Sequence, residues 1–358
     1  MDDRSLPQLR ADIDVVDRDL LDLLNRRAGL VREIRALKEC RNTGLHDSRR
    51  EQELVDTLVA RNAGPFPDAT IRRLFQEILK ASLAFMEQQG IEGFRVWRKP
   101  GEPDRVIDVD GFRFGEDREF IAGPCAVEDE EGMEAVASGL ASLGVRFLPG
   151  GAFKPRTSPY GFQGLGEPGL KILAAAADRH CMAAVSEVVD TRSVDLVARY
   201  VEVIQVGARN MSNFELLKEA GRTGRAVLLK RGPAATLDEL LAAAEYVVST
   251  GNERLILCER GIRTFVHLTR YTLDISAVPL LRQRTPFPVV VDVSHAAGRR
   301  DLLAPLAAAA FAAGAQGVMV EVHADPANAR SDAEQQITVD GFADLVRTVR
   351  DRVGGPPS

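Results

Sequence analysis

The chain has 358 residues, which is too long for one ordinary hydrophobic core and suits a small domain joined to one of roughly 250 residues. Its composition, 45% hydrophobic and 27% charged, is that of a globular protein, and no apolar run approaches the roughly 20 residues that a membrane-spanning helix requires. The formal net charge of −6 argues against nucleic acid or an anionic membrane surface as a partner, because both need broad basic patches. An anionic ligand therefore needs a local basic cluster.

The N-terminal residues are acidic and are not followed by an apolar signal core, so we expect a cytoplasmic protein. Disulfides are not expected in that reducing compartment, and the cysteines have no zinc-like spacing. Most of them are expected to be buried as small apolar side chains. They are Cys40, Cys125, Cys181 and Cys258.

Three helices are predicted within residues 1–90. Apolar side chains recur at helical spacing over residues 6–41, with hardly a breaker. Residues 47–62 repeat the pattern, and Asp68 is expected to cap a third helix that runs to about Gln89. The first domain is therefore predicted to be all-α.

Residues 91–118 are predicted to be a linker followed by a β-hairpin. Pro100, Gly101 and Pro103 interrupt regular structure at the start of this stretch. Residues 106–114 then alternate in polarity around an Asp110-Gly111 turn, which is the pattern of a two-residue hairpin.

Residues 119–358 have the pattern of parallel βα units, because short apolar runs alternate with Ala/Leu-rich helical stretches. The runs begin near Phe120, Arg146, Ala183, Val203, Ala226, Arg254, Pro288 and Gly317. Eight right-handed units close a barrel, so the predicted fold class is α/β, a (β/α)8 TIM barrel preceded by an all-α three-helix domain. An open, doubly wound sheet is the structural alternative.

Charged or reactive side chains follow seven of the eight predicted strands, where the active sites of such barrels lie. They include Cys125, Lys154, Arg156, Thr157, Arg209, Lys230, Arg231, Glu259, Arg260, His295 and Glu321. Any one of these charges is more often solvated or half of a surface ion pair. Cations on successive strands, however, repel one another unless anions lie between them, which points to phosphorylated or carboxylated ligands.

Four of the side chains could hold a divalent metal, because they combine soft, borderline and hard donors. They are Cys125, His295, Glu321 and Asp332, the last on the loop after the final strand. The sequence thus predicts metal-assisted chemistry on an anionic substrate.

The sequence from Gly150 to Tyr160, GGAFKPRTSPY, resembles class Iβ of the DAHP synthases. Further segments follow in that family's order, beginning at Gly123 (GPCA), Gly207 (GARNM), Leu228 (LLKRG), Cys258 (CERGIRT), Asp292 (DVSH), Glu321 (EVH) and Ser331 (SD). The resemblance covers the chain from about Phe120 onwards. It implies a metal-dependent transferase that condenses phosphoenolpyruvate with erythrose 4-phosphate and releases phosphate, the first step of the shikimate pathway.

The same resemblance implies the roles of individual residues. The metal would be held by Cys125, His295, Glu321 and Asp332; manganese is the expected ion, and iron, cobalt and zinc are alternatives. Phosphoenolpyruvate would be held by Lys154, Arg209, Lys230 and Arg260, and the sugar phosphate by Arg156 and Thr157. Lys154, the expected proton donor, and Cys125 would be the catalytic residues. One position departs from the family, because Pro149 stands where an arginine is usual, and we therefore expect weaker binding of phosphoenolpyruvate.

Basic residues lie on the apolar face of the first predicted helix. Arg27 and Lys38 share this face, and Arg10 projects about a quarter turn away, towards a different protomer if helices pair. The ordinary explanation is that their aliphatic stems pack while the charges reach water. On the second helix one face carries Asp47, Arg50 and Glu51, where an exposed row of salt bridges is the ordinary explanation.

Together with Ser82, these residues resemble the all-helical chorismate mutases, whose three-helix chains intertwine as dimers. The resemblance implies that Arg10 of the partner chain and Arg27 clamp the carboxylates of chorismate. Lys38 would face the ether oxygen, and Asp47 with Glu51 would meet the ring hydroxyl. Arg27, Lys38 and Glu51 would be catalytic, and Arg50 and Ser82 complete the binding set. Met86, however, replaces the family's second donor to the ether oxygen, and a thioether cannot donate a hydrogen bond.

Three functional hypotheses remain open. The first is a bifunctional homodimer or homotetramer whose weak mutase domain also senses an end product. The second is a monofunctional DAHP synthase with a purely regulatory domain that binds prephenate or chorismate. The third is a related synthase for an eight-carbon sugar acid, against which the KPRTS sequence beginning at Lys154 argues.

Overall fold

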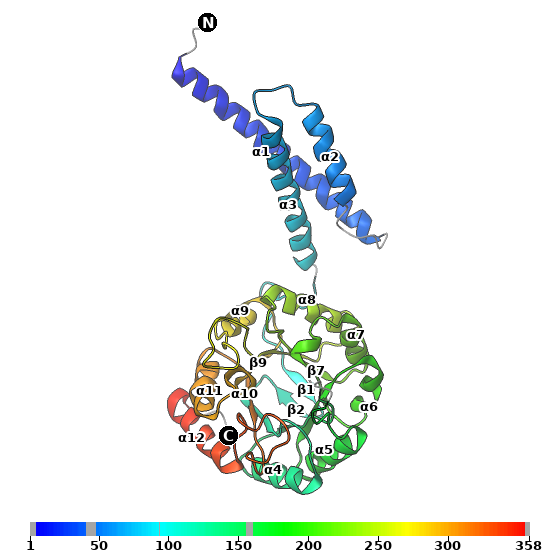
Figure 1. The fold of residues 1–358 in the computed structure, drawn as a ribbon, viewed down its shortest axis with the longest axis vertical. Coiled ribbons are helices and arrows are strands. Elements are labelled where there is room, and N and C mark those ends of the chain that lie inside the picture. The colour runs from blue at the N-terminus through cyan, green and yellow to red at the C-terminus, as the bar shows by residue number, and fades with distance from the viewer. Residues whose placement is uncertain (1–4, 41–47, 93, 155–159, 355–358) are drawn as a thin grey trace. The chain divides into compact units, whose positions relative to one another are not determined.

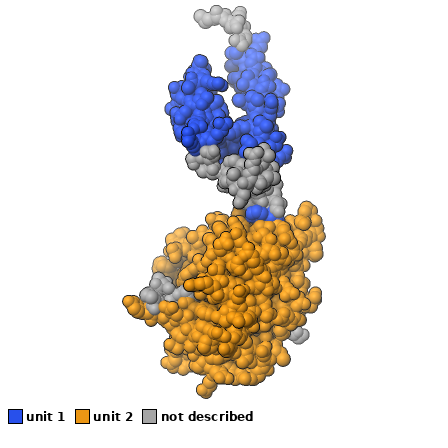
Figure 2. Space-filling model, turned by 90° about the vertical axis from the view of Figure 1, so that its right-hand side faces the viewer, with its two compact units in different colours: residues 1–94 blue, residues 95–358 orange. Residues whose placement is uncertain are grey.

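The computed structural model describes residues 5–40, 48–92, 94–154 and 160–354, apart from the side chains of residues 35–40, 48 and 86–92. The chain divides into two compact units, Met1–Phe94 and Arg95–Ser358 (Figure 2). Among the described residues, no helix combines the length and apolar character needed to cross a bilayer.

The first unit contains the three predicted helices. They are α1 (Leu6–Cys40), α2 (Ser48–Ala60) and α3 (Asp68–Glu92) (Figure 1). Asp68, expected as a cap, is instead the first residue of α3, and its carboxylate accepts a hydrogen bond from Asn62 Nδ2 at 2.8 Å. Such differences of one or two residues are usual where helix ends fray.

The predicted hairpin is present and packs against the start of the barrel. Strands β1 (Ile107–Val109) and β2 (Phe112–Phe114) pair antiparallel around Asp110 and Gly111, which both have positive φ angles, 46° and 93°. This is the backbone that a two-residue hairpin turn requires. Phe114 is fully buried, and its ring lies 5.1 Å from that of Phe147, the first residue of β4. The hairpin therefore closes the N-terminal end of the barrel.

In the described part of the chain, eight parallel strands close a barrel in the order β10-β3-β4-β5-β6-β7-β8-β9, which confirms the predicted fold. The strands are β3 (Glu119–Gly123), β4 (Phe147–Pro149), β5 (Ala183–Val188), β6 (Val203–Val206), β7 (Ala226–Lys230), β8 (Leu255–Glu259), β9 (Val289–Asp292) and β10 (Gly317–Glu321). Each begins within one residue of its predicted start. These runs are apolar on both faces because the barrel interior covers one face and helices cover the other.

Helices surround the strands as an outer ring, except for the short α10, which lies closer to the strands (Figure 1). They are α4 (Glu130–Ser142), α5 (Glu167–Arg179), α6 (Val194–Ala198), α7 (Phe214–Arg222), α8 (Leu237–Val248), α9 (Ala277–Arg284), α10 (Val293–Ala297), α11 (Leu303–Ala312) and α12 (Val339–Val353). Gly123 shows how closely the strands approach, because a Cβ there would lie 2.4 Å from the carbonyl oxygen of Pro149. The closed barrel leaves the C-terminal strand ends facing one common cavity.

Candidate active site

A cavity of about 510 Å³ opens at the C-terminal ends of the strands. Six cations line it, namely Lys154, Arg209, Lys230, Arg260, Arg263 and Arg270. Four carboxylates line it as well, namely Glu187, Asp292, Glu321 and Asp332. Six cationic and four acidic side chains give the lining an excess of two positive charges before any metal binds. The lining is therefore suited to small ligands that carry several negative charges.

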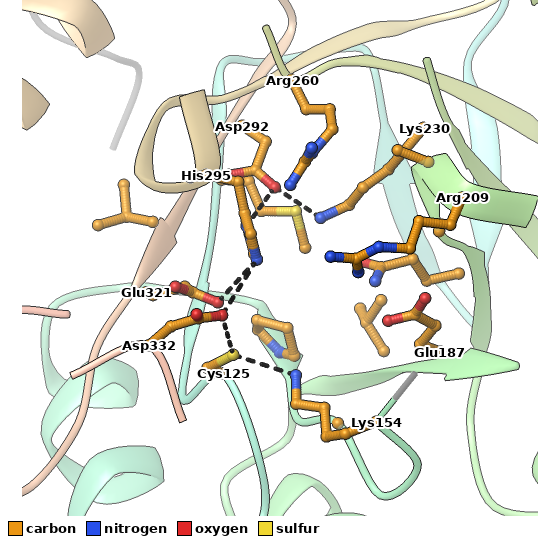
Figure 3. Close-up of a pocket in the computed structure, with 18 of the residues that line it drawn as sticks. Cys125, Lys154, Glu187, Arg209, Lys230, Arg260, Asp292, His295, Glu321 and Asp332 are labelled. Atoms are coloured by element: carbon orange, nitrogen blue, oxygen red, sulfur yellow. Dashed lines mark hydrogen bonds and ion pairs between the residues drawn. The ribbon is translucent and has the colours of Figure 1, made fainter. Parts of the chain in front are cut away.

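The four predicted metal ligands lie together on one side of the cavity (Figure 3). One ligand atom from each of Cys125, His295, Glu321 and Asp332 lies within 4.8 Å of the others. Cys125 follows β3, His295 lies in α10 directly after β9, and Glu321 ends β10. Three non-adjacent parts of the sequence thus supply thiol, imidazole and carboxylate donors to one point, a set that fits a divalent transition metal.

Burial keeps the cysteine of this set protonated when no metal is bound. Burial, together with the charges of Glu321 and Asp332, raises the pKa of the Cys125 thiol well above its ordinary range. Burial alone would raise the pKa of Asp332 too, but the charges of His295 and Arg270 outweigh it, and this pKa is lowered. Because thiolate is the form that binds metal, metal binding would release a proton from Cys125.

Asp292 connects the candidate metal ligands with the cations. It lies at the end of β9, is fully buried, and its Oδ2 is 2.8 Å from His295 Nδ1 and 2.6 Å from Lys230 Nζ (Figure 3). The carboxylate accepts the proton on Nδ1, which leaves Nε2 of His295 available to a metal. Burial alone would raise the pKa of Asp292, but the charges of His295 and Lys230 outweigh it and hold this pKa well below its ordinary value.

Lys154 lies beside the candidate metal ligands, with its Nζ 3.1 Å from Cys125 Sγ. It is carried by the loop after β4, which ends at Pro149, and not by the strand itself. Gly151 permits this arrangement, because a Cβ there would lie 2.7 Å from Lys154 Nζ. Burial alone would lower the pKa of Lys154, but Cys125, Glu187 and Glu321 outweigh it, and this pKa is raised. Lys154 is therefore a charged proton donor within reach of the ligand set.

Not every predicted rim residue lies in the cavity. Arg231 pairs with Glu259 and Asp274, each at 2.8 Å, and these three charges do not line the cavity that the described residues form. Arg156 and Thr157, the predicted sugar-phosphate ligands, lie outside the described residues. Arg209, Lys230 and Arg260 line the cavity opposite the candidate metal ligands (Figure 3).

Several cavity residues had no assigned role in the sequence. Asp292 could have been found, because it precedes His295 by three residues at a strand end. The place of Glu187 in the cavity is evident only from the closed barrel, since no distinctive sequence pattern surrounds this residue in β5. Tyr271 lies under the Arg260 guanidinium, 4.6 Å from the ring centre, and Arg270 lies 3.3 Å from Asp332.

In the helical unit, the structure brings Arg27 and Ser82 together, with the guanidinium donating a hydrogen bond to the hydroxyl. Arg10 lies on the same helix as Arg27, about 25 Å away at 1.5 Å per residue. Arg50 and Glu51 lie in the first turn of α2. Asp47 and the side chains of Lys38 and Met86 lie outside the described residues.

Two family profiles match the chain. That of the DAHP synthetase I family matches residues 102–353, and that of chorismate mutase type II matches residues 9–87. The chain is 50% identical over 248 residues to the phospho-2-dehydro-3-deoxyheptonate aldolase of Thermotoga maritima, covering 69% of this chain and 73% of the relative. It is 34% identical over 266 residues to a 2-dehydro-3-deoxyphosphooctonate aldolase of Granulibacter bethesdensis, covering 69% of this chain and 93% of the relative.

Solved structures show the same similarity. A crystal structure of the Thermotoga maritima DAHP synthase matches with a TM-score of 0.70 and 48% sequence identity. The match covers 72% of this chain and 76% of the synthase chain. A truncated form of that synthase matches with a TM-score of 0.67 and 45% identity, over 72% and 94%.

Proposed function

The chain belongs to the DAHP synthetase I family and carries a chorismate mutase type II domain, and from this premise we propose that its barrel condenses phosphoenolpyruvate with erythrose 4-phosphate in the cytoplasm. The main support for this proposal is that the four-residue ligand set faces the cations Arg209, Lys230 and Arg260 across one cavity. The greater identity to the heptonate enzyme, 50% against 34% to the octonate enzyme, favours the seven-carbon product.

The cavity charges match the proposed substrates. Phosphoenolpyruvate carries a carboxylate and a phosphate, and Arg209, Lys230 and Arg260 offer charge-assisted hydrogen bonds to both. Burial alone would lower the pKa of Lys230, but Asp292 outweighs it, so that this pKa is raised and the ammonium stays charged. The sugar phosphate would then bind on the Lys154 side, where its aldehyde can approach the ligand set.

The chemistry requires alignment and one well-placed proton. A divalent metal, held by Cys125, His295, Glu321 and Asp332, would polarise the aldehyde carbonyl as a Lewis acid; manganese is the proposed ion. The cations align the enol carbon with the aldehyde carbon, and Lys154 gives its proton to the aldehyde oxygen as the carbon–carbon bond forms. Water then adds to the cationic carbon and returns one proton to Lys154. The bond from this carbon to the phosphate oxygen breaks, the added hydroxyl becomes the ketone carbonyl, and its proton leaves with the phosphate.

The proposal is tested by turnover of the purified chain with phosphoenolpyruvate and erythrose 4-phosphate, and separately with chorismate, before and after chelation. We expect phosphate release with the first pair and its loss on chelation. Condensation of phosphoenolpyruvate with a five-carbon sugar phosphate in preference to erythrose 4-phosphate would contradict the proposal.

Pro149 is expected to weaken the binding of phosphoenolpyruvate, and Pro149→Arg to improve it. Pro149 lines the cavity at the end of β4, where an added guanidinium could reach an anionic ligand. A charge-assisted hydrogen bond contributes roughly 1.5–3 kcal/mol, so the Michaelis constant for phosphoenolpyruvate should fall about tenfold or more. Steady-state kinetics of both proteins check this result, with Pro149→Lys as a variant that adds charge without a planar donor pair. An unchanged constant would show that another cation already fills the position.

The helical unit is proposed to act as a dimer. Along α1 the apolar side chains of Ile13, Val16 and Leu20 are 59%, 55% and 52% exposed, whereas Val31 is buried. An apolar face of this length needs a partner helix. Because Arg10 and Arg27 are too far apart along α1 to hold one ligand, each site would combine Arg27, Lys38 and Glu51 of one chain with the partner chain's Arg10. We therefore propose a homodimer or homotetramer.

We propose that this domain binds chorismate or prephenate but catalyses the rearrangement of chorismate only slowly. It would then serve as a feedback sensor. Arg27 and the hydroxyl of Ser82 already form a polar pair that a carboxylate can join. A preorganised donor to the ether oxygen contributes a factor of about a hundred to a thousand, and Met86 supplies none. Met86→Gln should therefore raise mutase turnover at least about tenfold, measured by chorismate consumption.

The sensor role has its own test in the full chain and in a variant that lacks residues 1–94. The barrel sites all lie beyond this deletion, so condensation should persist while inhibition by prephenate or chorismate disappears. A truncated protein that is still inhibited by prephenate, or a wild-type mutase as fast as Met86→Gln, would overturn the sensor role.

A further inference from the structure

One short segment after β10 supplies one of the four candidate metal ligands and contacts two others. Residues 331–336 supply Asp332 itself, and the Ser331 hydroxyl oxygen lies 3.0 Å from Cys125 Sγ. Gln336 Oε1 accepts a hydrogen bond from the Cys125 backbone N–H at 3.0 Å. Gln335 Nε2 donates to the Glu321 carboxylate. A single loop thus both provides one ligand and holds two others.

The two glutamines are enclosed and have defined orientations. Gln335 is 3% exposed and Gln336 is fully buried. Gln336 turns its oxygen to an N–H and its nitrogen to the Ser331 carbonyl oxygen, 2.7 Å away. Gln335 turns its nitrogen to a carboxylate and its oxygen to the Arg270 guanidinium, 3.0 Å away. Each contact pairs a group that only donates with one that only accepts, so neither amide can be reversed without loss of both bonds.

His295 is supported differently. Its Nδ1 lies against Asp292, which also pairs with Lys230 on the substrate side of the cavity. The ligand set therefore has two supports, one through Asp292 and Lys230 and one through the loop of Gln335 and Gln336, where Arg270 also contacts Gln335. Changes in the glutamines should consequently act on the metal without disturbing the Lys230–Asp292 pair.

We propose that Gln335 and Gln336 are positioning residues that hold the Glu321 carboxylate and the Cys125 backbone in the geometry that binds the metal. The inference rests on the proposed function, since it presumes that these ligands bind a divalent ion. Hydrogen-bond partners of metal ligands typically change metal affinity by about ten- to a hundredfold.

Titration of the metal-stripped full chain with Mn²⁺ by calorimetry tests the inference without reference to activity. Gln335→Leu and Gln336→Leu should each weaken Mn²⁺ binding by about ten- to a hundredfold. Gln316→Leu is the matched control, because Gln316 is also buried, its Oε1 also accepts a backbone N–H, from Val289 at 3.0 Å, and it precedes β10 at the opposite end of the barrel. This variant should lose thermal stability in the metal-free state while its Mn²⁺ affinity stays at the wild-type value.

The outcomes separate the inference from the function on which it rests. Glutamine variants that bind Mn²⁺ as tightly as wild type, or a Gln316→Leu protein that binds it as weakly as they do, would overturn the positioning role. A wild-type chain that binds no Mn²⁺ would overturn the proposed metal site itself. If a leucine variant does not fold, the corresponding alanine variant, which leaves room for water beside the uncovered polar groups, is titrated with the same expected result.

Discussion

Replacement of Cys125, His295 or Glu321 by alanine is expected to lower the rate of condensation more than about a thousandfold, and chelation of the metal should do the same. The ligand atoms converge within 4.8 Å from three separate strand ends. The loss of any one of them would therefore leave the metal with an incomplete set of ligands. A Lewis acid stabilises the transition state by several kcal/mol, and each 1.4 kcal/mol is a factor of ten in rate. Phosphate release, measured with and without added Mn²⁺, checks the result.

The barrel should remain folded in these variants, because the changed side chains lie at the C-terminal strand ends, where they line a cavity. Cys258→Ala is a matched control, since Cys258 is a fully buried cysteine of β8 that lies outside the ligand set. It should retain most of the activity and its dependence on metal. Full activity of a demonstrably metal-free wild-type sample would contradict the proposed role of the ligand set.

Asp292→Asn is expected to destabilise the barrel by roughly 3–5 kcal/mol and to weaken metal binding about ten- to a hundredfold. The substitution leaves the buried Lys230 ammonium without its carboxylate, and breaking a buried ion pair in this way is costly. It also removes the group that orients His295. Urea unfolding and Mn²⁺ titration of the variant measure the two effects separately. The control is Asp274→Asn, because Arg231 keeps Glu259 as a partner when Asp274 is neutralised.

The stability difference between Asp292→Asn and wild type should depend on pH with a definite sign. The folded-state pKa of Asp292 is depressed, so its carboxylate contributes stability in full above the ordinary aspartate value of about 3.9. That contribution is lost as the pH falls below this value towards the folded-state pKa. The difference should thus be constant near neutral pH and shrink in acid. A difference that grew on acidification would show that the carboxylate is not charged in the folded protein.

Several features of the barrel follow from local sequence. The starts of the eight strands could be predicted because each strand is apolar on both faces and is bounded by turn residues. The hairpin could be predicted because Asp110-Gly111 tolerates positive φ angles. Parallel strands also share one C-terminal edge, so the sequence alone placed Cys125, His295 and Glu321 together on one rim.

The pairing of buried charges could not be predicted in the same way. Arg231 and Glu259 follow strands as regularly as Lys230 and Arg260, yet they neutralise each other away from the cavity. Each partner is separated from the other by a whole βα unit. Which cation faces the cavity is therefore decided by the carboxylate that the closed barrel places beside it.

By itself, the sequence determined the fold class, the order of the strands and three donors of the candidate metal site, Cys125, His295 and Glu321, because these depend on periodicity and on residue types at strand ends. Only the tertiary structure decided that Asp292 joins His295 to Lys230, that Gln335 and Gln336 bond to Glu321 and Cys125, and that Arg27 meets Ser82. Apart from the Asp292–His295 pair, these contacts join residues at least 14 positions apart, and hydrogen bonds of about 3 Å require geometry that forms only when distant elements pack together.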